Sequence, residues 1–332
     1  MIILCASKIK CAAFSVFDQR IVRCAACYLT EMANLTIETL DGDKTDFVYT
    51  QGLAFLSSWL TPNTFPDVGQ YTKHLNDIRA LDIRDDDLFL ATYPKCGTNW
   101  VWEIMTMLRK GNTTYEKVTK EALFLDFTKL PNVDDFSTPR ILNSHLFPNQ
   151  IPKGIIDKKK KIVHVMRNPK DALVSLYYFC RIGEENTPMF RDFKTFLQYA
   201  IGTYGVSIWC SFFDYIKHWE VFTKQHPEQI LNIFYEDLKE DPVREIKKID
   251  KFLETNRDEE LITQIAEACS FQNLKKADLD KTKEDLHAHG AVYRKGMVGD
   301  WKTHFTVSMN EEIDKWIEEN SRGSDIKFRY TL

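Results

Sequence analysis

The most constraining feature of this 332-residue chain is the alternation of short apolar runs with helical patterns from residue 80 onward. Residues 87–92 (DLFLAT) are typical of a buried strand, and residues 99–110 (NWVWEIMTMLRK) of a helix that ends at Gly111. Further buried strands are predicted over residues 140–144, 161–166 and 230–235. Strands that alternate with helices form a parallel sheet covered by helices, so we expect an α/β fold.

Two helix starts in this region carry the same signal. Asn168-Pro169 and Asp241-Pro242 each combine a capping side chain with a first-turn proline, and they predict helices that run to Cys180 and to about Leu253. A helix is also expected over residues 258–268. Ser308 and Glu311 form a capping box that predicts a last helix over 309–320. The polar residues 278–299, which include two histidines, are expected to be a long loop.

Composition limits the classes of function. The net charge of −4 gives no basic footprint for nucleic acid, and the long uncharged stretch over residues 195–213 is interrupted by polar residues, so no membrane span is proposed. Beyond the first 27 residues the cysteines are sparse, which favours a reducing, cytoplasmic compartment. Cys24-x-x-Cys27 has no second pair at a fitting distance, so no metal site is predicted. Residues 1–31 are interpreted as an N-terminal extension of unknown role, and 32–332 as the main domain.

The turn at residues 93–98, between the first predicted strand and its helix, is suited to bind an anion. Such a turn directs unpaired backbone N–H groups and the positive end of a helix dipole toward one point, where Lys95 adds a cation and Thr98 a hydroxyl donor. The Walker A pattern is absent, because Lys95 precedes the glycine. A solvated lysine in a tight turn is the alternative reading.

Residues 93–100, YPKCGTNW, are similar to the 5′-phosphosulfate loop of the cytosolic sulfotransferases, usually YPKSGTxW. The resemblance, of the sulfotransferase family 1 type, extends through most of the chain after residue 45. It includes the segments RNPKD at 167–171, YEDLK at 235–239, RKG at 294–296 and GDWK at 299–302. It implies a single α/β domain with a P-loop NTPase-like architecture, and a sulfuryl donor, 3′-phosphoadenosine 5′-phosphosulfate (PAPS), that is used without a metal.

The resemblance also implies where PAPS binds. Because this donor carries anions at both ends, the protein needs two separate anion pockets. The first would be the loop of Lys95, Cys96, Gly97, Thr98, Asn99 and Trp100. The second would be formed by Arg167, Ser175, Arg294, Lys295 and Gly296. Adenine would contact Trp100, Phe213, Cys269, Ser270 and Phe271, although Phe213 appears where a tyrosine is common and Cys269 where a threonine is usual.

By the same resemblance, His145 is the base that accepts the acceptor's proton and Lys95 stabilises the leaving phosphate. Asn143, which is also assigned to the donor site, stands where many members have a lysine, so we expect reduced charge stabilisation and not inactivity. The acceptor would be a small hydrophobic molecule with a hydroxyl or amine group, bound beside His145 by residues 123–127 and 177–179.

Cys96 replaces the usual loop serine. A thiol at a helix N-terminus beside a lysine is expected to have a lowered pKa, which suggests an oxidation-sensitive switch over donor binding. The alternative is a small residue that merely fits.

Lys302, Thr306, Val307 and Glu311 match the family's short dimer motif KxxxTVxxxE, which predicts a homodimer.

Two other functions are alternatives to sulfuryl transfer. A phosphoryl-transferring kinase would need a Walker lysine and a carboxylate-held Mg²⁺, and neither pattern is seen. A catalytically weak, PAPS-binding regulatory homologue is the alternative that Asn143, Cys96 and Cys269 suggest.

Overall fold

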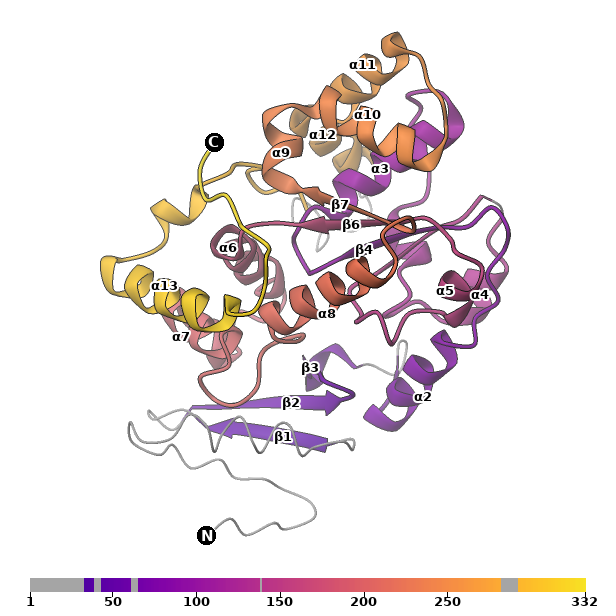
Figure 1. The fold of residues 1–332 in the computed structure, drawn as a ribbon. Coiled ribbons are helices and arrows are strands. Elements are labelled where there is room, and N and C mark those ends of the chain that lie inside the picture. Colours follow the sequence, from indigo (N-terminus) through magenta and orange to yellow (C-terminus); the bar gives the residue numbers. More distant parts are fainter. Residues whose placement is uncertain (1–32, 39–42, 61–64, 138, 282–291) are drawn as a thin grey trace. The chain divides into compact units, whose positions relative to one another are not determined.

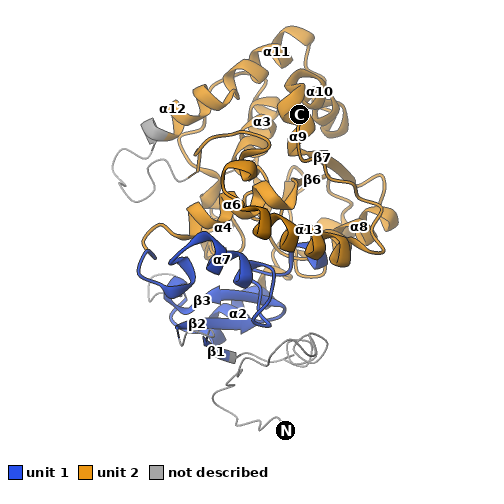
Figure 2. Ribbon diagram, turned by 90° about the vertical axis from the view of Figure 1, so that its left-hand side faces the viewer, with its two compact units in different colours: residues 1–76, 184–215 blue, residues 77–183, 216–332 orange. Residues whose placement is uncertain are grey.

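The computed structural model describes residues 33–38, 43–60, 65–137, 139–281 and 292–332. The N-terminal extension predicted over 1–31, with its CxxC pair, and most of the loop predicted over 278–299 lie outside the described residues. The chain forms two compact units, Met1–Asn76 with Glu184–Tyr215, and Asp77–Gly183 with Ile216–Leu332 (Figure 2).

The first unit contains a three-stranded antiparallel sheet that the strand signals above did not include. Its strands are β1 (Ala33–Glu38), β2 (Lys44–Thr50) and β3 (Leu53–Leu56). The ring of Phe55 packs edge-on against Tyr71 and Trp209, with ring centroids 5.2 and 5.1 Å apart. Further elements that lie here or begin here are η1 (Ser57–Trp59), α2 (Val68–Ile78), η3 (Pro188–Phe190), α7 (Phe193–Ala200) and α8 (Phe212–Gln225).

The second unit is built on a four-stranded parallel sheet in the order β5-β4-β6-β7, which confirms the predicted fold class. The strands are β4 (Leu88–Thr92), β5 (Ile141–Ser144), β6 (Ile162–Met166) and β7 (Ile230–Phe234). Every residue of β4, β5 and β6 is buried, as expected for strands covered on both faces. All four strands therefore end at the same edge of the sheet.

Helices cover this sheet on both faces, with α3 and α10 on one and α6 on the other (Figure 1). The longer helices are α3 (Thr98–Lys110), α6 (Pro169–Cys180), α10 (Pro242–Leu253), α11 (Glu259–Ala268), α12 (Phe271–Lys281) and α13 (Val307–Ser321). Shorter helices are η2 (Lys120–Leu123), α4 (Leu130–Asp134), α5 (Lys153–Asp157), α9 (Tyr235–Glu240) and η4 (Asp300–Thr303). Residues 278–281, predicted as loop, continue α12.

The predicted helix caps are confirmed at two of three sites. The side chain of Asn168 accepts a hydrogen bond from the backbone N–H of Asp171 at 2.9 Å, and that of Asp241 from Arg244 at 3.0 Å. The Ser308 capping box is wrong. Thr306 caps α13 instead, accepting from the N–H of Met309, because its hydroxyl reaches the first free N–H groups of a helix that begins at Val307.

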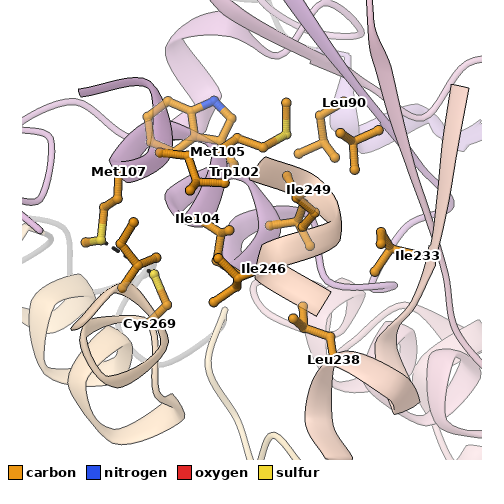
Figure 3. Close-up of a cluster of buried hydrophobic side chains, with 14 of the residues drawn as sticks. Leu90, Trp102, Ile104, Met105, Met107, Ile233, Leu238, Ile246, Ile249 and Cys269 are labelled. Atoms are coloured by element: carbon orange, nitrogen blue, oxygen red, sulfur yellow. Dashed lines mark hydrogen bonds between the residues drawn. The ribbon is translucent and has the colours of Figure 1, made fainter. Parts of the chain in front are cut away.

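One face of the sheet shares a hydrophobic core with α3, α10 and α11, and Figure 3 shows part of it. Trp102, Ile104 and Met105 from α3 pack there against Ile246 and Ile249 from α10. This packing fixes the start of α3, and with it the loop that joins β4 to α3.

Candidate functional site

Chemically active residues follow the carboxyl ends of all four parallel strands. Lys95 lies in the loop after β4, His145 directly follows β5, Arg167 follows β6, and Tyr235 follows β7. The chain leaves β4 toward β5 on one side and later leaves β6 toward β7 on the other. Ligands of open α/β sheets bind at such a switch point, outside the carboxyl ends of the strands.

The loop between β4 and α3 adopts a backbone shape that presents N–H groups to an anion. Lys95 and Gly97 have positive φ angles of 66° and 111°, and Gly97 is the N-cap of α3. A Cβ at Gly97 would lie 3.1 Å from the Tyr235 ring, so any side chain there is both strained and crowded. The first N–H groups of α3 have no partner within the helix and carry its positive dipole end. This geometry suits an anion, and binding by the loop stays a prediction.

His145 is held in one orientation as a neutral imidazole. Its Nδ1 lies 2.8 Å from the carbonyl oxygen of Thr92 and 3.0 Å from the Thr92 hydroxyl, which in turn contacts the Thr98 hydroxyl at 2.7 Å. Burial lowers the pKa of His145 well below its usual value, and the charge of Lys120 lowers it further. A neutral ring that donates from Nδ1 to a carbonyl carries its lone pair on Nε2. His145 is therefore arranged to accept a proton through Nε2.

Lys95 remains a cation at neutral pH but gives up its proton readily. Burial, aided by the charges of Lys120 and Arg167, lowers the pKa of Lys95 to about 8. Its ammonium group lies 3.9 Å from the centre of the Phe179 ring. A lysine ammonium that has lost part of its hydration interacts strongly with an anion brought close to it.

Arg167 joins the two predicted anion pockets. Its guanidinium donates to the carbonyl of Lys95 at 3.1 Å and to that of Met297 at 3.2 Å, and it stacks over Tyr235 at 4.2 Å. The Nε–H groups of Arg167 and Arg294 are both buried, with no hydrogen-bond partner among the described residues. Buried donors of this kind are costly unless a ligand or water satisfies them. They are therefore available to an anion.

The segment that carries Arg294 and Lys295 is held by two aspartates. Asp300 accepts from Arg294 at 2.5 Å and from Lys295 at 2.7 Å. Asp171 of α6 accepts from the backbone N–H groups of Gly299 and Trp301 at 2.7 and 3.0 Å. The segment is thus tied to the start of α6, the helix that follows β6.

Ser175 lies on α6, close in sequence to a residue that contacts Arg294. Arg294 stacks over the ring of Tyr178 at 4.7 Å, and Ser175 is one turn before Tyr178 on the helix. Arg294 therefore lies against α6, and the second pocket as a whole stays a prediction.

The aromatic residues predicted to contact adenine are partly brought together. The ammonium group of Lys239 lies 5.9 Å from the ring centres of both Trp100 and Phe271. Gly296, with a positive φ of 62°, lies so close to Phe271 that a Cβ there would come within 2.2 Å of the ring. Only glycine permits this approach of the cationic segment to Phe271.

Cys269 and Phe213, which were also predicted to contact adenine, have the following neighbours. Cys269 is packed in the hydrophobic core with its sulfur 3.7 Å from that of Met107, so its thiol faces the core (Figure 3). Phe213 belongs to the first unit, where it packs against Phe212. Ser270 is half-buried and immediately precedes α12.

Two buried charged residues near His145, Lys120 and Asp126, had no role assigned from the sequence. Asn143 is fully buried, and its Nδ2 donates to the carbonyl of Lys120 at 2.8 Å. The carboxylate of Asp126 accepts from the backbone N–H of His145 at 3.0 Å, and burial raises the pKa of Asp126 to about 7. No periodic or motif signal marks either charged residue. Their burial results from tertiary contacts.

The predicted lowering of the Cys96 pKa is wrong. Its side chain is completely buried, and burial raises the pKa of the thiol, although the charge of Arg167 acts in the opposite direction. Burial outweighs the helix N-terminus and the nearby cation, so little thiolate exists at neutral pH. Cys96 is a small buried residue.

We therefore expect Cys96 in the native protein to react with iodoacetamide at neutral pH at least about tenfold more slowly than in the urea-unfolded chain. Peptide mass spectrometry, which separates Cys96 from the other cysteines, measures this rate. Equal rates in the native and unfolded protein would contradict the assignment.

The four residues of the predicted dimer motif are all exposed. Thr306 also caps α13, and Val307 is 78% exposed. In the described part of the chain, no helix has the length and apolar character needed to cross a membrane. No group of three or more His, Cys, Asp or Glu side chains suited to a metal ion occurs among those residues either.

Known proteins share this architecture. The crystal structure of mouse sulfotransferase SULT7A1 complexed with PAP matches with a TM-score of 0.66 and 26% identity, over 84% of this chain and 96% of that one. A retinol dehydratase in a complex with retinol and PAP matches with a TM-score of 0.68 over 86% of this chain, and its 19% identity supports the fold alone.

Sequence relatives agree. Human sulfotransferase 1E1 is 35% identical over 278 residues, which cover 78% of this chain and 92% of that protein. Human sulfotransferase 1C2 is 33% identical over 277 residues, covering 76% of this chain and 89% of that protein. The family model described as "Sulfotransferase domain" matches residues 85–325, a span that contains the β4 loop, His145 and both arginines of the second pocket. The chain belongs to the sulfotransferase family.

Proposed function

We propose that this sulfotransferase moves a sulfuryl group from PAPS to the hydroxyl or amine of a small hydrophobic acceptor, with His145 as base and Lys95 at the leaving phosphate. The observation that carries the proposal is the convergence of Lys95, His145 and Arg167 at the carboxyl ends of three adjacent strands. A base, a cation for the leaving group and a second anion pocket are the parts that sulfuryl transfer requires.

The reaction follows from these positions. The acceptor oxygen or nitrogen attacks sulfur while Nε2 of His145 takes its proton. The bond between sulfur and the bridging oxygen of the 5′-phosphate breaks, and its electron pair stays on that oxygen. Lys95 and the N–H groups at the start of α3 stabilise the charge that accumulates there. The products are a sulfated acceptor and 3′-phosphoadenosine 5′-phosphate (PAP).

The donor pockets are proposed from the same contacts. Residues 95–100 would hold the 5′-phosphosulfate. A nucleotide of this kind is supported by the structural relative SULT7A1, at 26% identity, which is complexed with PAP. Arg167, Ser175, Arg294, Lys295 and Gly296 would hold the other phosphate, which would satisfy the buried Nε–H groups of both arginines. Trp100 and Phe271 would flank the adenine.

The acceptor would bind on the apolar side of this site. Phe124 packs edge-on against His145 with ring centroids 4.9 Å apart, and Phe179, beside Lys95, is 41% exposed. Aromatic side chains next to a base favour a hydrophobic hydroxyl compound such as a phenol or sterol, or an arylamine.

A homodimer through Lys302, Thr306, Val307 and Glu311 is part of the proposal. Their exposure supports it, because all four side chains are accessible to a second copy of the chain. The main domain is proposed to begin at residue 32.

The experiment is transfer from radiolabelled PAPS to a panel of phenols, sterols and arylamines, with EDTA present. We expect a labelled product and an equal amount of PAP with at least one acceptor. PAP binding without transfer to any acceptor would instead identify the regulatory, donor-binding homologue.

A further inference from the structure

The site lacks a cation at the position where the resemblance places one. Many sulfotransferases have a lysine where this chain has Asn143. Asn143 is fully buried in β5, and its Nδ2 donates to the carbonyl of Lys120 at 2.8 Å. An amide contributes no net charge, and this one is used to hold a neighbouring segment.

That segment, residues 120–126, is bound to β5 by its backbone. The N–H of Leu125 donates to the carbonyl of Asn143 at 3.0 Å, and Phe124 forms a parallel bridge with Asn143. The segment therefore runs beside β5 up to His145. There the carboxylate of Asp126 accepts a hydrogen bond from the backbone N–H of His145. One of the side chains that the segment buries is a cation.

Lys120 is that side chain. It is 7% exposed, and its ammonium group lies 4.3 Å from the centre of the Phe124 ring, which also packs against the imidazole of His145 with ring centroids 4.9 Å apart. The carboxylate of Glu121 lies 3.2 Å away, but that side chain is 53% exposed, so water screens its charge. The buried ammonium acts on its surroundings with much less screening.

The charge of Lys120 affects the pKa values of both His145 and Lys95. Burial is the largest cause that lowers the pKa of His145 and of Lys95, and Lys120 lowers both pKa values further. It also opposes the rise that burial causes in the pKa of Asp126. The titratable groups coupled to Lys120 come from three segments, and they are Lys95, Glu121, Asp126 and His145.

We propose that Lys120 supplies the second positive charge of the transfer site, in place of the lysine that Asn143 replaces. This inference rests on the proposed sulfuryl transfer. As the bond from sulfur to the 5′-phosphate oxygen breaks and the bond from sulfur to the acceptor forms, negative charge moves onto the oxygens around sulfur. A buried ammonium group beside the base stabilises that charge, and the acceptor's proton still goes to His145.

The test compares Lys120→Met with Lys117→Met, in which an exposed lysine three residues before Lys120 loses the same charge. We expect Lys120→Met to lower kcat by about 10² to 10³, the usual effect of one lost transition-state donor, and to leave PAP affinity within about threefold. Removing the nearby cation also raises the pKa of His145, so the acid side of the kcat/KM profile moves to higher pH. Lys117→Met should change neither.

The double variant Lys120→Met/Asn143→Lys returns a cation to the usual family position. Its kcat should be at least about tenfold higher than that of Lys120→Met. The proposal is overturned if Lys120→Met keeps more than about a third of kcat, or if its loss is matched by weaker PAP binding or a lower Tm, because Lys120 would then serve binding or folding. Failure of sulfuryl transfer in the parent protein would instead refute the proposed function.

Discussion

Replacing His145 with alanine is expected to lower kcat by about 10² to 10⁴ and to leave the Kd for PAP within about twofold. The buried imidazole is positioned by Thr92 and accepts a proton in the transition state, and it is not among the residues assigned to the donor pockets. Initial rates with radiolabelled PAPS and calorimetric titration with PAP measure the two effects separately. His218→Ala, which removes an exposed histidine, is the matched control.

The pH dependence of kcat/KM is a second test of the role of His145. A protonated imidazole cannot serve as base, so kcat/KM falls as pH drops through the pKa of His145. Because burial and the charge of Lys120 lower that pKa well below 6.5, the fall is expected on the acid side of this value. If His145→Ala keeps more than about a tenth of the parent kcat, another group is the base.

Replacing Lys95 with methionine should lower kcat/KM for PAPS by at least about 10³, because one cation is lost both to donor binding and to the leaving phosphate. Lys153→Met, in which the side chain is 69% exposed, should be neutral. Methionine retains most of the apolar stem of lysine, so a loss of kcat/KM results from the missing charge. Steady-state rates at several PAPS concentrations measure the effect.

Lys95 also predicts an alkaline limit. Its pKa is lowered to about 8, and the deprotonated amine carries no charge, so PAP affinity in the parent should weaken as pH rises through this value. A bound anion favours the protonated form, so the decline for the complex is displaced to higher pH. Lys95→Arg should bind PAP without this decline. A Lys95→Met variant with unchanged kcat/KM would contradict the assignment.

The elements around the site could be predicted because their signals are local. A buried parallel strand is a short apolar run, and a capping side chain followed by proline marks a helix start within three residues, as at Asn168 and Asp241. The anion-binding loop lies between two such elements, so its position was predictable too. The resemblance then located His145 and the distant arginines, which no periodic pattern marks.

What sequence could not predict depends on burial created by tertiary contacts. No pattern in the sequence distinguishes Lys120 from a surface lysine, and only the pairing of its segment with β5 buries it near His145. For Cys96, the helix N-terminus and the neighbouring lysine favour the thiolate, but complete desolvation is the larger effect and reverses the expected pKa shift. In both cases the magnitude of burial decided the chemistry.

The claim on which the account depends is that two anion pockets, one around Lys95 and one around Arg167 and Arg294, bind the two ends of a single nucleotide. Calorimetric titration with PAP and with adenosine 5′-phosphate tests it most directly. We expect one PAP per chain, bound at least about tenfold more tightly than adenosine 5′-phosphate, because the latter leaves the second pocket empty. Equal affinity for the two nucleotides would contradict it.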